Sequence, residues 1–133
     1  AESLRIETTR HRGCVVLRAR GVLDHAGRAA FSTHVRAEWD RSPGTVLVFD
    51  LGELLFYDSS AVGVLAVALQ RMRVAGGGRL VLVRPTGHLL DVLRRTGLLA
   101  YVEVRDSVSE ILAELNLPEP REPQDRFRYG RQP

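Results

Sequence analysis

Lysine is absent from the 133 residues, and all nineteen basic side chains are arginines. Against sixteen acidic residues they give a formal net charge of +3. Acids are interspersed among the arginines and no basic run reaches five residues, so the linear sequence shows no concentrated basic stretch. Because affinity for nucleic-acid phosphates needs such a basic face, we expect no direct nucleic-acid partner.

Cysteine is almost as scarce. Cys14 is the only one and lies in an apolar run, which excludes a disulfide framework and a cysteine metal cluster and favours a reducing compartment. The histidines are scattered, without an i, i+4 pair that encloses a carboxylate, so we expect no metal. The glycine run 76–78 lacks the lysine and hydroxyl of a phosphate loop, and we expect no cofactor.

Long apolar runs are also missing. No stretch approaches the roughly 18 uninterrupted apolar residues of a membrane span, and residues 1–12 lack the apolar core of a secretory signal. We therefore expect a cytoplasmic protein. Its length is that of one domain with an adequate core.

The order of strand-like and helix-like apolar patterns along the chain predicts an α/β fold. The sequence favours a mixed sheet of about five strands with about four helices mainly on one face. Strands are expected at 4–9, 14–19, 45–49, 80–83 and 101–104, with Gly21 ending the second. Helices are expected after Asp24, at 60–74, around 89–93 and after Asp106, where Val108, Ile111, Leu112 and Leu115 form one apolar stripe. Residues 1–116 are expected to form the domain and the proline-rich residues 117–133 a flexible tail.

Alternation in the second strand indicates how the sheet is covered. Val15, Leu17 and Ala19 alternate with positions that include Arg18 and Arg20, so one face of this strand should be free of helices. The two runs at 45–49 and 80–83 are continuous and apolar, as in parallel strands covered on both faces. The helix between them predicts a strand, helix, strand unit. Phe31 and Trp39 are expected in the core.

The segment 50–69 carries the strongest functional signal. A strand is expected to end near Asp50, a loop carries 54–57, and Asp58, Ser59 and Ser60 precede a helix. A helix N-terminus favours anionic and acceptor groups, and plain N-capping would account for these residues. However, the first two turns of the helix have almost no polar face. Either other elements cover them or an apolar surface awaits a partner.

Three motifs carry a family resemblance. The stretch 56–65, with sequence FYDSSAVGVL, is similar to the phosphorylation loop of STAS domains of the anti-sigma-factor antagonist family. Residues 21–24 (GVLD) resemble the family's Gly-Glu-Leu-Asp turn, and 93–98 (LRRTGL) its helix ending in Thr-Gly-Leu. The chain departs from the pattern at Ala61, where the family has glycine, and at Val22, where it has an acid. The resemblance covers residues 4–116.

The resemblance implies a partner-switching phosphoprotein in transcription regulation, without catalysis by this chain. Ser59 would be the phosphoacceptor. The unphosphorylated protein would bind an anti-sigma factor with serine kinase activity and a histidine-kinase-like ATPase fold, freeing a sigma factor, and a serine phosphatase would reverse the modification. The expected partner-binding residues are Asp24, Asp58, Ser60, Val62 and Ala66, whereas Leu65 and Leu69 should face the sheet.

Other functions are also compatible with the sequence. A STAS scaffold in a stress complex or a small-ligand-binding subunit of a lipid-transport system would need no phosphorylation switch, but the sequence Asp58-Ser59 favours one. A small-molecule or nucleotide sensor would need a pocket with converging polar groups that the sequence does not reveal. A hydrolase triad using Ser59 would lack the G-x-S-x-G elbow.

Overall fold

A computed structural model describes residues 4–57, 60–119 and 122–129, without the side chains of Phe56, Ser60, Ala61 and Tyr129. In chain order the strands are β1 Leu4–His11, β2 Cys14–Leu23, β3 Val46–Tyr57, β4 Arg79–Val83, β5 Glu103–Arg105 and β6 Asp125–Tyr129. The helices are α1 His25–Arg41, α2 Ser60–Ala75, α3 Gly87–Arg95 and α4 Val108–Glu114, with a 3-10 turn η1 at Leu98–Tyr101.

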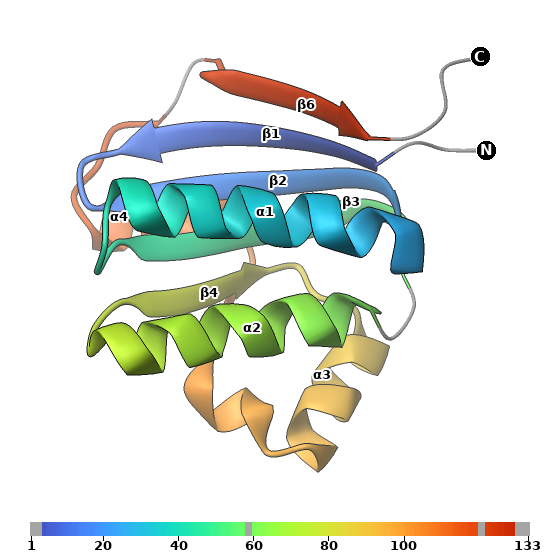
Figure 1. The fold of residues 1–133 in the computed structure, drawn as a ribbon. Helices are drawn as coiled ribbons and strands as arrows, with labels where there is room; N and C mark the ends of the chain where they lie inside the picture. The colour runs from blue at the N-terminus through green and yellow to red at the C-terminus, as the bar shows by residue number, and fades with distance from the viewer. Residues whose placement is uncertain (1–3, 58–59, 120–121, 130–133) are drawn as a thin grey trace.

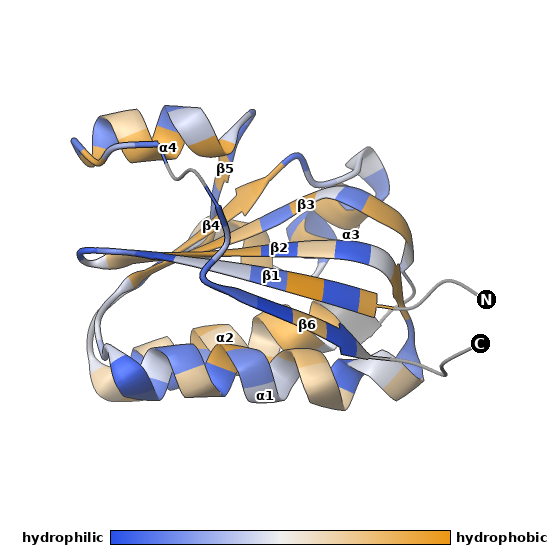
Figure 2. Ribbon diagram, turned by 90° about the horizontal axis from the view of Figure 1, so that it is seen from above, coloured by the Kyte–Doolittle hydropathy of each residue, from blue (hydrophilic) through white to orange (hydrophobic). Residues whose placement is uncertain are grey.

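The strands form one mixed sheet in the order β5-β4-β3-β2-β1-β6. β1 and β2 are an antiparallel hairpin, β2 to β5 run parallel, and β6 pairs antiparallel with β1. α1 and α2 connect parallel strands and lie together on one face (Figure 1). α4 lies on the opposite face, over one end of the sheet (Figure 2). The predicted α/β fold with helices mainly on one face is confirmed.

The sheet separates two apolar clusters. On the face covered by α1, α2 and α3, residues of alternating strand positions pack with helix residues, and Phe31 meets Phe49 edge to face at 5.5 Å between ring centroids. Trp39 is buried in this cluster, as predicted. On the other face, Ile111 and Leu112 of α4 cover valines of β2, β3 and β4. The apolar stripe predicted for this last helix is therefore confirmed.

Two strands continue where the sequence predicted their ends. β2 passes through Gly21, whose φ of +88° and adjoining register shift let the ladder continue to Leu23. β3 likewise runs through Asp50 to Tyr57, so residues 54–57 are strand and not loop. The prediction failed because a carboxylate usually marks a strand end. Here Asp50 is fully buried and bound by arginines.

Helix starts were predicted well, with one shift of a residue. Asp24 caps α1 and accepts a 3.0 Å hydrogen bond from Gly27 N. Ser107, not Asp106, caps α4, because its hydroxyl is the group that accepts from Glu110 N at 3.1 Å. The strand expected at 101–104 begins two residues later, at Glu103, because the preceding residues form η1.

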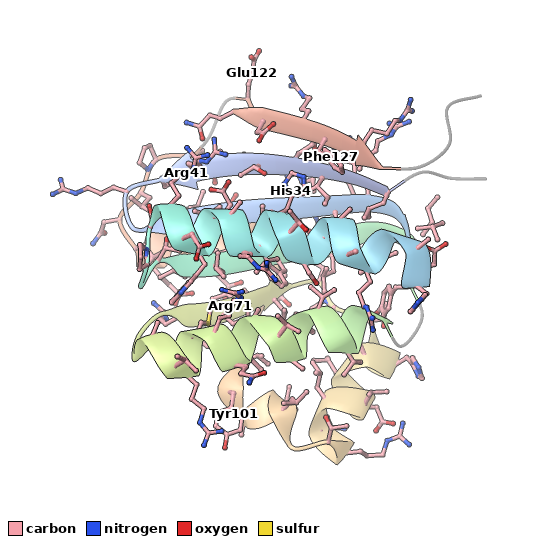
Figure 3. The ribbon with its side chains drawn as sticks, viewed as in Figure 1. His34, Arg41, Arg71, Tyr101, Glu122 and Phe127 are labelled. Atoms are coloured by element: carbon pink, nitrogen blue, oxygen red, sulfur yellow. The ribbon has the colours of Figure 1, made fainter. Side chains whose placement is uncertain are left out.

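β6 comes from the segment predicted to be a flexible tail, and it raises the strand number from about five to six. It pairs with β1 over five residues, and Gln124 N donates to Thr8 O at 2.8 Å. Phe127 packs against the main core and its ring lies 4.5 Å from that of His34 on α1 (Figure 3). Asp125–Tyr129 therefore form a strand of the sheet, whereas the sequence predicted a flexible tail there.

Phe127 should anchor β6. Phe127→Ala removes a half-buried ring, and we expect it to lower the free energy of unfolding by about 1 to 3 kcal/mol, less than the loss for a fully buried phenylalanine. Tyr101→Ala is the matched control because Tyr101 is 71% exposed. Urea unfolding measures both. Equal stability of the two variants would show that β6 is not held by this ring.

His34 should make stability depend on pH. Burial against β6 lowers the pKa of its imidazole; Asp125 and Glu38 oppose this shift and Arg10 adds to it. Below about pH 6.5 the unfolded chain then binds more protons than the folded one, so stability falls as pH falls. His34→Gln should weaken this dependence between pH 7 and 5.5 in urea titrations. An unchanged slope would contradict the assignment. Part of the slope that remains should come from His11, whose pKa burial also lowers.

Candidate functional site

The candidate site lies at one end of the sheet, where β2 and β3 finish and α1 and α2 begin. The last ladder pair of the two strands joins Leu23 to Tyr57. Asp24 follows β2 directly, and α2 begins at Ser60. Asp58 and Ser59 lie outside the described residues.

Tyr57 ties the strand before the loop to the start of α3. Its hydroxyl hydrogen-bonds with the hydroxyl of Thr86, and Thr86 N donates to the same tyrosine oxygen at 3.3 Å. Thr86 also caps α3, accepting from Leu89 N at 3.2 Å. The residue that precedes Asp58 is thus fixed by a contact from another element.

The residues predicted to bind a partner are only partly available for one. Asp24 is exposed, but its carboxylate is engaged as the cap of α1. Val62 and Ala66 are half-buried, and Val62 packs against the main core. Ser60 opens α2, and its side chain is not described. Leu65 is buried and Leu69 packs against the core, as predicted for residues that face the sheet.

Exposed apolar residues outside the predicted partner-binding set lie near the end of β3 and along α2. Leu55 is 70% exposed at the register irregularity of β3, three positions before Asp58. On α2, Val67 and Val74 are 43% and 82% exposed, seven positions apart and so on one side of the helix. The helical spacing of Val67 and Val74 is visible in the sequence and could have predicted their exposure. The exposure of Leu55 could not be predicted, because the register irregularity of β3 arises only when β3 pairs with β2.

Val67 and Val74 lie along a groove between α1 and α2. Its volume is about 450 Å³, and it is lined by Trp39, Asp40, Val67, Gln70, Arg71, Val74 and Ala75. Arg71 reaches toward α1 (Figure 3), with Nη1 4.0 Å from Asp40 Oδ1. The apolar surface inferred from the sequence of this helix is therefore divided: α1, α3 and the sheet cover one part, and another faces outward.

A cation lies against the first turn of α2. A Cβ placed on Gly63 would be 3.6 Å from Cδ and 3.7 Å from Nη1 of Arg28, so this side chain of α1 crosses the helix close to its start. These distances are ordinary van der Waals contacts, so an alanine at this position would also fit. The site thus combines an exposed apolar residue, Leu55, with a helix N-terminus and a nearby guanidinium.

Metal-binding clusters and membrane-spanning helices are absent from the described residues. Within residues 4–57, 60–119 and 122–129 no group of three or more His, Cys, Asp or Glu side chains is arranged to hold a metal ion. Across the same ranges, every helix is too short or too polar to cross a bilayer.

Comparisons with known proteins agree with this architecture. The STAS domain family matches residues 5–111. An anti-sigma F factor antagonist from Paenibacillus polymyxa is 31% identical over 117 residues, which cover 86% of this chain and 97% of that protein.

Two solved structures share the fold. The anti-sigma factor antagonist SpoIIAA in its unphosphorylated form has a TM-score of 0.68 at 20% identity, over 84% of this chain and 96% of its own. SpoIIAA of Bacillus, described as a cell fate determinant, has a TM-score of 0.69 in its phosphorylated form, at 21% identity over 83% and 98% of the two chains. At these identities the likeness concerns the fold alone.

Tyr57→Phe should loosen the base of the loop. Loss of the hydroxyl removes its bonds to Thr86, and we expect about 1 kcal/mol less stability together with faster hydrogen exchange at residues 57–60 and 84–87. Tyr101→Phe is the control, since this exposed tyrosine has no hydrogen bond to any described residue. Unchanged exchange at both segments would mean that Tyr57 does not order the loop.

Proposed function

Because the chain belongs to the STAS domain family, we propose that it is an anti-sigma factor antagonist whose association with an anti-sigma factor is switched by phosphorylation of Ser59. The main support for this proposal is the 31% identity to an anti-sigma F factor antagonist over almost the whole of that relative. The sequence Asp58-Ser59, directly before α2, supports Ser59 as the acceptor.

In this proposal the unphosphorylated protein docks onto an anti-sigma factor that is also a serine kinase with a histidine-kinase-like ATPase fold. Docking frees a sigma factor. Phosphorylation ends the docking, and a serine phosphatase restores the form that binds. The docking surface surrounds the loop and includes exposed Leu55 and the accessible parts of Val62 and Ala66. Exposed apolar groups of this kind gain by being covered.

The switch has an electrostatic basis. A phosphate on Ser59 adds about −1.5 to −2 charges beside Asp58, at the border of an apolar surface. Covering that charge without matching cations on the partner weakens association, and each 1.4 kcal/mol is about a factor of ten in affinity. Within the domain the anion is tolerated, because the N-terminus of α2 attracts negative charge and Arg28 lies one turn away. The fold therefore persists while the interface fails.

Substitutions at Ser59 test the switch. We expect Ser59→Ala to fold normally and to bind the ATPase-fold anti-sigma factor permanently, even with ATP. Ser59→Asp should fold normally and bind at least about tenfold more weakly, because a fixed negative group mimics the phosphate. Calorimetric titration with candidate anti-sigma factors of the source organism measures both.

Ser109→Asp is the matched control, because it adds the same charge at an exposed position of α4, on the opposite face. Equal weakening by both aspartates would show a general charge effect. Incubation with kinase and ATP, followed by mass spectrometry, locates the phosphate; modification of Ser60 alone would overturn the assignment to Ser59.

A further inference from the structure

The face of the sheet opposite α1 and α2 gathers arginines that are scattered in the sequence. Residues directly opposite each other in a β-ladder share a face. The register sets Arg20 of β2 opposite Arg5 of β1, and Arg5 opposite Arg128 of β6. Three guanidinium side chains thus form a row across three adjacent strands.

A second row adds to the first, two residues further along each strand. Here Arg18 of β2 and Arg126 of β6 both lie opposite Glu7 of β1. After β4, Arg84 adopts a left-handed backbone conformation (φ +53°) and donates to Asp50 Oδ1 at 3.0 Å. We call these six residues the arginine face: Arg5, Arg18, Arg20, Arg84, Arg126 and Arg128.

The acids of this face neutralise only part of its charge. Asp50 binds Arg18 and Arg84, with its Oδ2 3.2 Å from Arg18 Nε. Glu7 lies 3.5 Å from Arg20, which also pairs with Glu53. Six arginines therefore face three carboxylates. Glu122 stands at the border, beside a small cavity that includes Glu7 and Arg18.

Two members of the face have no counter-ion among the described residues. Arg5 and Arg128 are exposed and take part in none of the ion pairs found there. They also stand directly opposite each other, and like charges in that position are destabilising. An acidic group bound between them would relieve the repulsion and receive charge-assisted hydrogen bonds.

The surface is also uncovered. α4 packs on the apolar end of this face, over Val16 and Val48, and leaves the half that carries the arginine rows without a helix (Figure 2). β6 is the last strand of the sheet, so its outer side has no paired strand within the described structure. A charged face therefore adjoins a strand edge that can accept another strand.

We propose that the arginine face binds an acidic, extended segment of a partner protein, which adds to the outer edge of β6 and directs alternate carboxylates onto Arg128, Arg126 and Arg5. The interspersed acids argue against a uniform polyanion, because Glu7 and Glu53 would face its charges. A second copy is disfavoured, since antiparallel pairing about Phe127 would set Arg126 against Arg128.

A peptide titration of the full chain tests the proposal, which is independent of the switch at Ser59. The probe is a synthetic peptide of alternating glutamate and threonine; its controls are the same peptide with glutamine for glutamate and one with all glutamates consecutive. We expect the alternating peptide to bind most tightly, with an affinity that falls as salt rises, and to slow hydrogen exchange in residues 125–129.

The double variant Arg5→Gln, Arg128→Gln should lose at least about tenfold in affinity for this peptide. The double variant Arg36→Gln, Arg73→Gln is the control. These arginines are exposed on α1 and α2, so replacing them removes the same charge from the other face. The control should stay within about twofold of the unmodified chain. The test variant should melt no lower than the unmodified chain, because it relieves a repulsion.

Several results would overturn the proposal. Equal binding of the glutamine peptide would show that charge plays no part. Equal losses of affinity in the two double variants would show that binding does not depend on this face. Preference for the peptide with consecutive glutamates would contradict an added strand. Tighter binding of a single-stranded oligonucleotide or of vesicles with anionic lipid would assign the face to another class of partner.

Discussion

The alternation of side chains along β2 and β3 is the constraint on which the molecule depends. In a strand, successive residues point to opposite faces, so a single register decides what both faces carry. One face is apolar throughout and receives α1, α2 and α3. The other changes character along β3, from Val48 beneath α4 to Asp50 and then Glu53. Asp50 marks that boundary, because a buried carboxylate requires the cations supplied by Arg18 and Arg84.

Local features were predictable from sequence because they depend on neighbouring residues. The cap at Asp24, the helix after Ser60 and the stripe on α4 each follow from spacing within one segment. The extent of β3 was not predictable. Whether Asp50 ends a strand depends on Arg84, which lies 34 residues away and reaches it only once β4 is paired.

The arginine face could not be found in the sequence for the same reason. Its row of Arg20, Arg5 and Arg128 comes from three strands, and the last lies in a segment whose prolines argued against any strand. The pattern of β6, in which Phe127 stands between two arginines, is too short to predict a strand by itself. Pairing with β1 makes this segment a strand, because the unpaired edge of β1 offers backbone groups that a neighbouring segment can satisfy. The low expectation for phosphate binding rested on the linear spread of arginines, whereas folding brings six of them together.

The loop and the arginine face lie toward the same end of the sheet, yet they need not interfere. Arg20 and Asp24, the residue after β2, are four positions apart, which is about 13 Å of extended chain. That exceeds the screening length of about 8 Å at physiological ionic strength, so a charge at Asp24 is largely screened from Arg20. The apolar surface near the loop involves β3 and α2, whereas the acidic segment would meet β1 and β6. Under the two proposals, a phosphate would control one partner while the other stays bound, because the two surfaces involve different strands of the sheet.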